Sequence, residues 1–166
     1  QIAFYEGEFL VKALESEEEL RQAYHLRHRI FAETLRWVPE RNNKLESDVY
    51  DAWSTSIGLF SDQQLLGIVR MTPAPFPFML ESEFSACLAG SHRVRKDLDT
   101  AEITRLALDP VIRDKSLSAR LMLTLIKGIY QWALVHDIRY LYLAVEHPFL
   151  RVLRGLGISC CPLRQR

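Results

Sequence analysis

The predicted sheet centres on the stretch Asp99-Thr100-Ala101-Glu102-Ile103-Thr104-Arg105-Leu106-Ala107-Leu108-Asp109-Pro110. A strand that is buried on both faces is normally almost wholly apolar, yet Glu102 and Arg105 stand in the middle of this one. Strict alternation would place these two side chains on opposite faces of the sheet. For both to serve one cavity the strand needs a β-bulge, and bulges are common next to active sites. A structural ion pair at a strand end is the alternative interpretation.

The segments around this strand predict an α/β domain with a mixed sheet. Strands are predicted at 9–15, 54–60, 65–72 and 138–145, and helices at 16–35, 78–88, about 117–136 and 149–156. The first helix begins with a capping box, because Glu19 follows the N-cap residue Ser16 by three positions. The strands at 54–60 and 65–72 should form an antiparallel hairpin, whereas the helix after Pro110 is a crossover that predicts one parallel or splayed pair.

The composition is that of a globular protein, with 48% hydrophobic and 25% charged residues, and the length predicts one domain over residues 1–166. A net charge of zero argues against nucleic acid as the main partner. No apolar run approaches the roughly 18 residues of a membrane span, and no apolar leader follows a basic start. The three cysteines fit neither a disulfide framework nor a metal site, so we expect reduced thiols in a cytoplasmic protein.

Arg27 lies on the apolar stripe of the first predicted helix. A buried arginine needs an anionic partner, unless its side chain reaches the surface. Three carboxylates follow within six residues, at Glu46, Asp48 and Asp51, and their spacing is not that of a calcium loop. We interpret them as an anionic patch that pairs with Arg27 and Arg70 and holds a cationic substrate. A solvated acidic loop is the simpler alternative.

Taken in order, these residues resemble the acyl-homoserine-lactone (autoinducer) synthase family. The motifs that carry the resemblance are Arg27-x-x-x-Phe31, Trp37, Glu46-x-Asp48-x-x-Asp51, Arg70, Phe84 and Glu102-x-x-Arg105. The chain departs from the family pattern at Arg36, where glycine is usual, at Thr104, where serine is usual, and in the proline-rich run 72–77. Its C-terminal strand region is short or absent. The related long-chain N-acyl amino acid synthases carry several of the same charges.

The resemblance implies a GNAT-like fold of three layers, in which helices flank a mixed central sheet. It implies transfer of a fatty acyl group from phosphopantetheine on acyl carrier protein, with no tightly bound cofactor. The acceptor that the resemblance implies is S-adenosylmethionine or, as the alternative, an amino acid. In the coenzyme A loop at 113–118, serines replace the usual glycines and Asp114 adds a negative charge, which favours the carrier protein over free coenzyme A. A domain that binds an acyl ligand without catalysis is the second alternative.

The predicted reaction needs a base, an oxyanion site and a binding pocket. Glu46 and Glu102 are the two candidates for the general base that deprotonates the attacking amine. Backbone N–H groups near the bulge, from Thr104 to Leu106, are expected to stabilise the oxyanion. The residues predicted to bind substrate are Arg27, Phe31, Trp37, Asp48, Asp51, Arg70, Phe84, Thr104 and Arg105. Arg151, Arg154, Arg164 and Arg166 form either a docking face for an acidic carrier or a solvated face.

Overall fold

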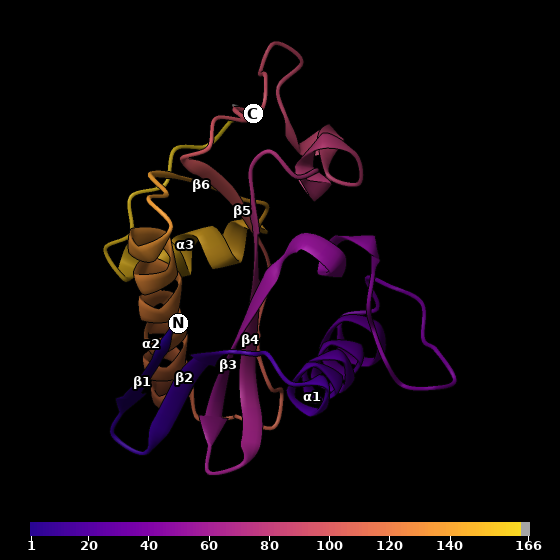
Figure 1. Cartoon of the computed structure of the whole chain (residues 1–166), viewed down its shortest axis with the longest axis vertical. Coiled ribbons are helices and arrows are strands. Elements are labelled where there is room, and N and C mark those ends of the chain that lie inside the picture. Colours follow the sequence, from indigo (N-terminus) through magenta and orange to yellow (C-terminus); the bar gives the residue numbers. More distant parts are fainter. Residues whose placement is uncertain (164–166) are drawn as a thin grey trace.

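The computed structural model describes residues 1–163, which contain one six-stranded sheet in the order β1-β2-β3-β4-β5-β6 (Figure 1). The strands are β1 (Ala3–Glu6), β2 (Phe9–Ala13), β3 (Thr55–Ser61), β4 (Gln64–Pro73), β5 (Thr100–Leu108) and β6 (Tyr140–Leu143). Neighbouring strands are antiparallel except for β5 and β6, which are parallel. This topology confirms the predicted mixed sheet, its hairpin and its crossover.

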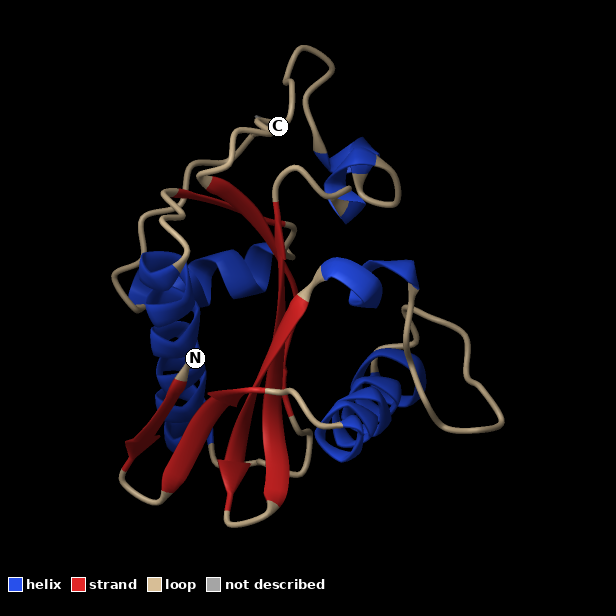
Figure 2. Ribbon diagram, viewed as in Figure 1, coloured by secondary structure: helices blue, strands red, loops and turns tan. Residues whose placement is uncertain are grey.

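Helices cover both faces of the sheet, as Figure 2 shows. Helix α1 (Glu17–Arg27) packs on one face, where Leu26 joins a buried cluster with Phe60 and Ile68. Helices α2 (Lys115–Val135) and α3 (His147–Gly155) lie on the other face, where Leu125 joins a cluster with Ile57. The three-layer prediction is therefore confirmed.

The first helix begins as predicted but changes type halfway. Ser16 Oγ accepts a hydrogen bond from the Glu19 N–H at 3.1 Å, and the Glu19 carboxylate accepts one from the Ser16 N–H at 3.3 Å, which completes the capping box. After Arg27 the chain continues as a π-helix, η1 (His28–Thr34). The prediction of one regular helix to residue 35 is wrong, because apolar spacing alone does not separate the two helix types. π-Helical turns are rare and are frequent at functional sites.

Strand β5 contains the predicted bulge. Ile68 of β4 pairs with Ala107 of β5, and Arg70 pairs with Thr104, so two steps along β4 match three along β5. Arg105 adopts a φ of 57°, in the left-handed region that side chains other than glycine rarely enter. The extra residue brings the side chains of Thr104 and Arg105 to the α1 face of the sheet.

The bulge also lies where β5 loses its second neighbour. The parallel ladder between β5 and β6 runs from the pair Thr100 and Tyr140 to the pair Ile103 and Leu143. Beyond Ile103, the edge of β5 that faces away from β4 pairs with no strand in the part of the chain described. The backbone around the bulge is therefore not covered by strand pairing on this edge.

Several expectations need correction. Strand β1 was not predicted; it pairs with β2 across a turn where Gly7 has a φ of 60°. The helix expected at 78–88 is two short 3-10 turns, η3 (Met79–Glu81) and η4 (Ser85–Cys87).

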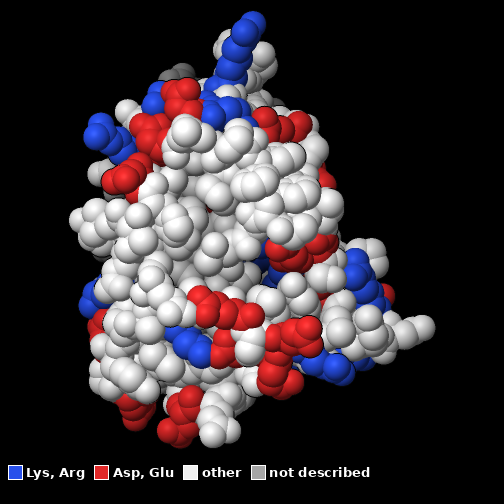
Figure 3. Space-filling model, in the orientation of Figure 1, with Lys and Arg blue, Asp and Glu red and all other residues white. Residues whose placement is uncertain are grey.

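The three cysteines are free. Within residues 1–163, no helix has both the length and the apolar character that a membrane crossing needs. Figure 3 shows that basic and acidic side chains both occur across the face in view, without one continuous basic area.

Candidate active site

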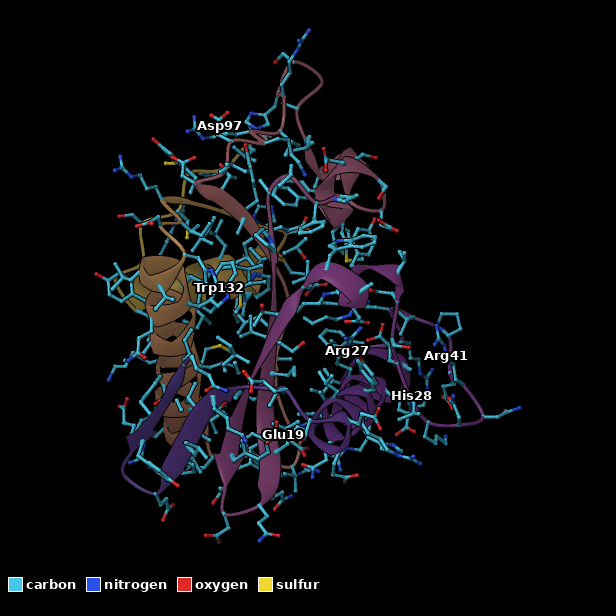
Figure 4. The ribbon with its side chains drawn as sticks, in the orientation of Figure 1. Glu19, Arg27, His28, Arg41, Asp97 and Trp132 are labelled. Carbon is cyan, nitrogen blue, oxygen red and sulfur yellow. The ribbon has the colours of Figure 1, made fainter. Side chains whose placement is uncertain are left out.

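Three arginines and three carboxylates form a buried network on the α1 face of the sheet. They come from α1, from strands β4 and β5, from η2 (Val49–Trp53) and from the loop that leads into η2. Figure 4 labels Arg27 at the junction of α1 with the sheet. The members are Arg27, Arg70, Arg105, Glu46, Asp48 and Asp51. All six were predicted site residues, and the fold brings them together with equal numbers of positive and negative charges.

Arg27 is fully buried and uses all three of its guanidinium nitrogens. Its Nε lies 2.5 Å from Glu46 Oε2, and its Nη1 and Nη2 lie 2.6 and 3.2 Å from the two oxygens of Asp51. Burial alone would lower the pKa of Arg27, but the bonds to Glu46 and Asp51 outweigh it and raise the pKa above its ordinary value. The predicted anionic partners of Arg27 are confirmed.

Arg70 and Arg105 close the network from the sheet. Arg70 Nη1 lies 2.5 Å from Asp48 and 2.9 Å from Asp51, and Arg70 Nε donates to Thr104 Oγ1 at 2.9 Å. Arg105 Nη2 lies 2.9 Å from Glu46 and 3.1 Å from Asp48. Each carboxylate thus bridges two arginines, so removal of any member leaves a buried charge without its partner.

The two candidate bases have opposite surroundings, and Glu46 is the weaker base. Both of its oxygens accept hydrogen bonds from arginines. Burial raises the pKa of Glu46, but the bonds from Arg105 and Arg27 outweigh this and lower the pKa to about 2. A carboxylate held in this way is a poor proton acceptor near neutral pH.

Glu102 is 2% exposed and accepts two backbone hydrogen bonds instead of ion pairs. The N–H groups of Met79 and Leu80 each donate to one of its oxygens at 2.7 Å. No ion pair among residues 1–163 includes Glu102. Burial raises its pKa above the ordinary value, and the two backbone hydrogen bonds offset only part of that effect. Glu102 therefore lies beside the network and has a raised pKa, which makes it the stronger base of the two carboxylates.

The pKa of Glu46 predicts acid sensitivity of the fold. Its pKa falls from 4.5 in the unfolded chain to about 2 in the folded one. Its contribution to the stability of the fold is therefore complete above pH 4.5. We expect the stability contributed by Glu46 to be lost progressively as pH falls from 4.5 to about 2. Urea unfolding across this pH range should show that the free energy of unfolding falls more steeply with decreasing pH for the wild type than for Glu46→Gln. Parallel curves for the two proteins would contradict this assignment.

The three predicted aromatic residues separate into two places. The rings of Phe31 and Trp37 lie 5.9 Å apart, and the guanidinium of Arg105 lies 5.3 Å from the centre of the Phe31 ring. Phe31 is buried, whereas Trp37 is 58% exposed and lies at the rim. Phe84 instead packs against the cluster that contains Phe78 and Leu80, close to the amide donors of Glu102.

Two further residues belong to the site but were not predicted from the sequence. Met79 donates its N–H to Glu102, and its sulfur lies 3.2 Å from Arg70 Nη2 and 3.7 Å from Arg105 Nη1. A methionine between apolar neighbours gives no signal of such a role. The ring of Tyr50 lies 5.7 Å from the guanidinium of Arg70. Its position within the acidic motif was the available signal.

A mixed sheet covered by helices on both faces, with a bulged central strand, is the architecture of the GNAT-like fold. The chain belongs to the autoinducer synthase family, whose model matches residues 12–165. An acyl-homoserine-lactone synthase of Aeromonas salmonicida is 33% identical over 147 residues, which cover 87% of this chain and 69% of that protein.

Two solved structures of acyl-homoserine-lactone synthases are similar to this chain. LasI superimposes with a TM-score of 0.80 at 21% identity, covering 90% of this chain and 78% of LasI. BjaI, a coenzyme A-dependent synthase solved with S-adenosylmethionine and isopentyl-coenzyme A, gives a TM-score of 0.76 at 25% identity. This match covers 89% of this chain and 69% of BjaI. The family and the fold predicted from the sequence are confirmed.

Proposed function

We propose that this chain transfers a fatty acyl group from an acyl carrier protein thioester to the amino group of S-adenosylmethionine, which yields an acyl-homoserine lactone. The observation that carries the proposal is the bulge in β5. The bulge places Arg105 on the same face as Glu102 and Thr104, beside the edge of β5 that β6 does not cover. One short stretch of β5 thereby supplies a substrate-binding group, a proton acceptor and backbone N–H groups for the thioester oxygen.

Glu102 acts as the general base in this scheme, directly or through one water. Its raised pKa suits proton transfer better than the low pKa of Glu46. The amine nitrogen attacks the thioester carbonyl, the C–N bond forms and the C–S bond breaks. The pantetheine thiolate leaves and takes up the proton.

Backbone N–H groups on the uncovered edge of β5 stabilise the oxyanion that forms during the attack. This edge begins at Thr104, where the β5–β6 ladder has ended. Donors that are already in place are effective because they need no reorganisation as charge develops. The hydrogen bond from Arg70 Nε to Thr104 Oγ1 holds the strand at this point.

The charged network would position the acceptor. Asp48 has the most exposed side chain of the three carboxylates, at 21% against 5% for Glu46 and 11% for Asp51. Asp48 is therefore the best placed to receive the acceptor's ammonium group, while the arginines attract its carboxylate. After acylation, an oxygen of that carboxylate attacks the carbon beside the sulfonium. The lactone ring closes, the carbon–sulfur bond breaks and methylthioadenosine leaves.

The direct test is thiol release from a set of acyl carrier proteins, with S-adenosylmethionine as acceptor and mass spectrometry of the products. Lactone together with methylthioadenosine is the expected result. An N-acyl amino acid formed from a free amino acid, without methylthioadenosine, would replace the proposed acceptor. Absence of thiol release with every acceptor would favour a domain that only binds an acyl ligand.

Helix α2 supports the carrier protein as donor. Asp114 is the N-cap of this helix, and its Oδ1 accepts the N–H of Leu117 at 2.7 Å. A pyrophosphate at this helix terminus would have to compete with a carboxylate that already occupies one donor and repels an anion. BjaI is a coenzyme A-dependent relative, so the donor has to be tested for this chain.

Asp114→Asn separates these donors, because asparagine caps helices about as well as aspartate but carries no charge. We expect the KM for acyl-coenzyme A to fall by about fivefold, since the like charge at the helix N-terminus is gone. The rate with acyl carrier protein should stay unchanged. The matched control is Asp137→Asn, which removes the same charge just after the C-terminal end of α2, away from the proposed donor site. Equal KM values in all three proteins would contradict a role of Asp114 in donor choice.

The basic residues predicted to form a docking face lie partly on α3. Arg151 and Arg154 are both exposed on this helix. Arg164 and Arg166 lie outside the described residues. Exposed arginines on one helix would attract an acidic carrier protein, and we propose that Arg151 and Arg154 contribute to its docking.

A further inference from the structure

The backbone segment that holds Glu102 is itself folded around one cation. Met79 and Leu80, whose N–H groups donate to the two Glu102 oxygens at 2.7 Å, lie in η3. The cation is Lys96, from the loop that leads into β5. We propose that Lys96 is a positioning residue for the reaction, which fixes the segment 76–81 so that these two N–H groups meet Glu102. The inference rests on the proposed role of Glu102 as the general base.

Lys96 contacts this segment at three points. Its Nζ donates to the backbone carbonyl of Phe76 at 2.5 Å and to Glu81 Oε2 at 2.8 Å. The same Nζ lies 3.4 Å from the centre of the Phe78 ring. An ammonium group has three N–H bonds, so each of these three acceptors can receive one of them. The contacts reach both ends of the segment and enclose the two backbone donors of Glu102 between them.

Glu81 connects Lys96 to the backbone of the segment. The Glu81 oxygen that accepts from Lys96 also accepts the N–H of Phe78 at 2.8 Å, and the N–H of Glu81 donates to the Phe78 carbonyl at 3.1 Å. These bonds close one turn, with Met79 and Leu80 in its middle. The side chains of Lys96 and Glu81 are 27% and 38% exposed, so their attraction alone adds little to stability. The pair therefore acts mainly on the shape of the turn.

The charge of Lys96 supports the ionised form of Glu102. The charged and titratable groups around this carboxylate include Arg70 of β4, Tyr50 of η2, Glu81 of η3 and Lys96. Burial raises the pKa of Glu102, whereas the positive charges of Arg70 and Lys96 lower it. Removal of Lys96 should therefore raise the pKa of Glu102 further, through the lost charge and through weaker backbone hydrogen bonds.

The first test needs no substrate and therefore does not depend on the proposed reaction. In Lys96→Met, NMR should show amide hydrogen exchange of Met79 and Leu80 about tenfold faster than in the wild type. Titration of the ¹³C-labelled carboxyl group should show a higher pKa for Glu102. The control Lys127→Met, which removes a surface ion pair of α2, should change neither quantity. Unchanged exchange and an unchanged pKa in folded Lys96→Met would overturn the proposal.

The second test measures acyl transfer. Lys96→Met should lower kcat by about tenfold and leave the KM for the acceptor unchanged, because it misplaces the base but lies outside the charged network. The rise of kcat/KM with pH should move to higher pH, and Lys96→Arg, which keeps the charge and the donors, should recover part of the rate. A higher KM with unchanged kcat, or an unshifted pH profile, would overturn the proposal. Absence of acyl transfer in the wild type would refute the proposed function, and the substrate-free test would still decide whether Lys96 fixes the segment.

Finally, Glu81→Gln tests the connection between Lys96 and the backbone. The glutamine oxygen can still accept the N–H of Phe78, but the ion pair with Lys96 is lost. We expect amide exchange and kcat to change in the same direction as in Lys96→Met and by a smaller factor, since the contacts of Lys96 with Phe76 and Phe78 remain. The double variant should be no more impaired than Lys96→Met alone, because both substitutions remove the same contact. Additive effects of the two substitutions would overturn the connection through Glu81.

Discussion

Glu102→Gln is expected to lower kcat for acyl transfer by a factor of about 10² to 10⁴, the usual contribution of a general base. Glutamine has nearly the same shape as glutamate but cannot take the amine proton. Because a base acts in the transition state, kcat and kcat/KM should fall together while the KM for the acceptor changes little. Rapid-quench measurement of thiol release would provide both constants. A folded variant with the wild-type rate would exclude Glu102 as the base.

Stability has to be measured in parallel, because the two Glu102 oxygens accept the N–H groups of Met79 and Leu80. The glutamine NH₂ would face one of these donors, and the loss of that hydrogen bond should cost about 1–3 kcal/mol. Glu46→Gln is the matched comparison. We expect it to weaken acceptor binding and stability, yet to keep the pH dependence of the chemical step, since Glu46 is not the base.

The pH dependence of the reaction should identify Glu102 independently. Its pKa is raised above 4.5, so kcat/KM should increase as pH rises through that raised value and Glu102 becomes ionised. This increase of kcat/KM with pH should be absent from the residual activity of Glu102→Gln. The effect on stability has the opposite sign to that of Glu46. At pH values between 4.5 and the raised pKa, Glu102 binds more protons in the folded chain than in the unfolded chain. The contribution of Glu102 to stability therefore falls as pH rises through this range.

Arg27→Met is expected to destabilise the fold by about 3–5 kcal/mol, the usual cost of leaving a buried charge without its partner. Methionine fills much of the same volume but leaves Glu46 without one of its two arginines and Asp51 without its bidentate partner. Urea unfolding should show a lower midpoint with an unchanged slope. If the variant folds under assay conditions, the KM for the acceptor should also rise.

The control for Arg27→Met is Lys127→Met, which removes an ion pair with Glu6 that lies at the surface. Its effect on the free energy of unfolding should stay within about 1 kcal/mol. A similar small effect of Arg27→Met, together with an unchanged KM for the acceptor, would mean that the network neither stabilises the fold nor positions the substrate.

Much of the fold follows from residues that neighbour one another in the sequence. Ser16 and Glu19 start the first helix through contacts three residues apart. The charged pair Glu102 and Arg105 predicts a bulge, because an ordinary strand would turn the two side chains to opposite faces. The structure confirms both features. The π-helix and the irregular turns at 78–88 escaped prediction, since their apolar spacing resembles that of ordinary helices.

The site was predicted less completely, because its partners come from distant segments. Arg27 and Asp51 lie 24 residues apart, and Arg105 and Glu46 lie 59 apart. The order of the charges indicated a shared site without indicating which carboxylate pairs with which arginine. Phe84 was predicted to line the same pocket as Phe31 and Trp37, but the structure shows it in the cluster beside Glu102's amide donors.

The linear order of residues was therefore enough to establish the family, the charged strand with its bulge and the need of Arg27 for an anionic partner. The choice between Glu46 and Glu102 as base required the folded chain. A carboxylate's pKa depends on burial and on the groups within hydrogen-bonding distance, and these come from separate segments. Glu46 is placed between two arginines, whereas Glu102 is placed on two backbone N–H groups without an ion pair among residues 1–163.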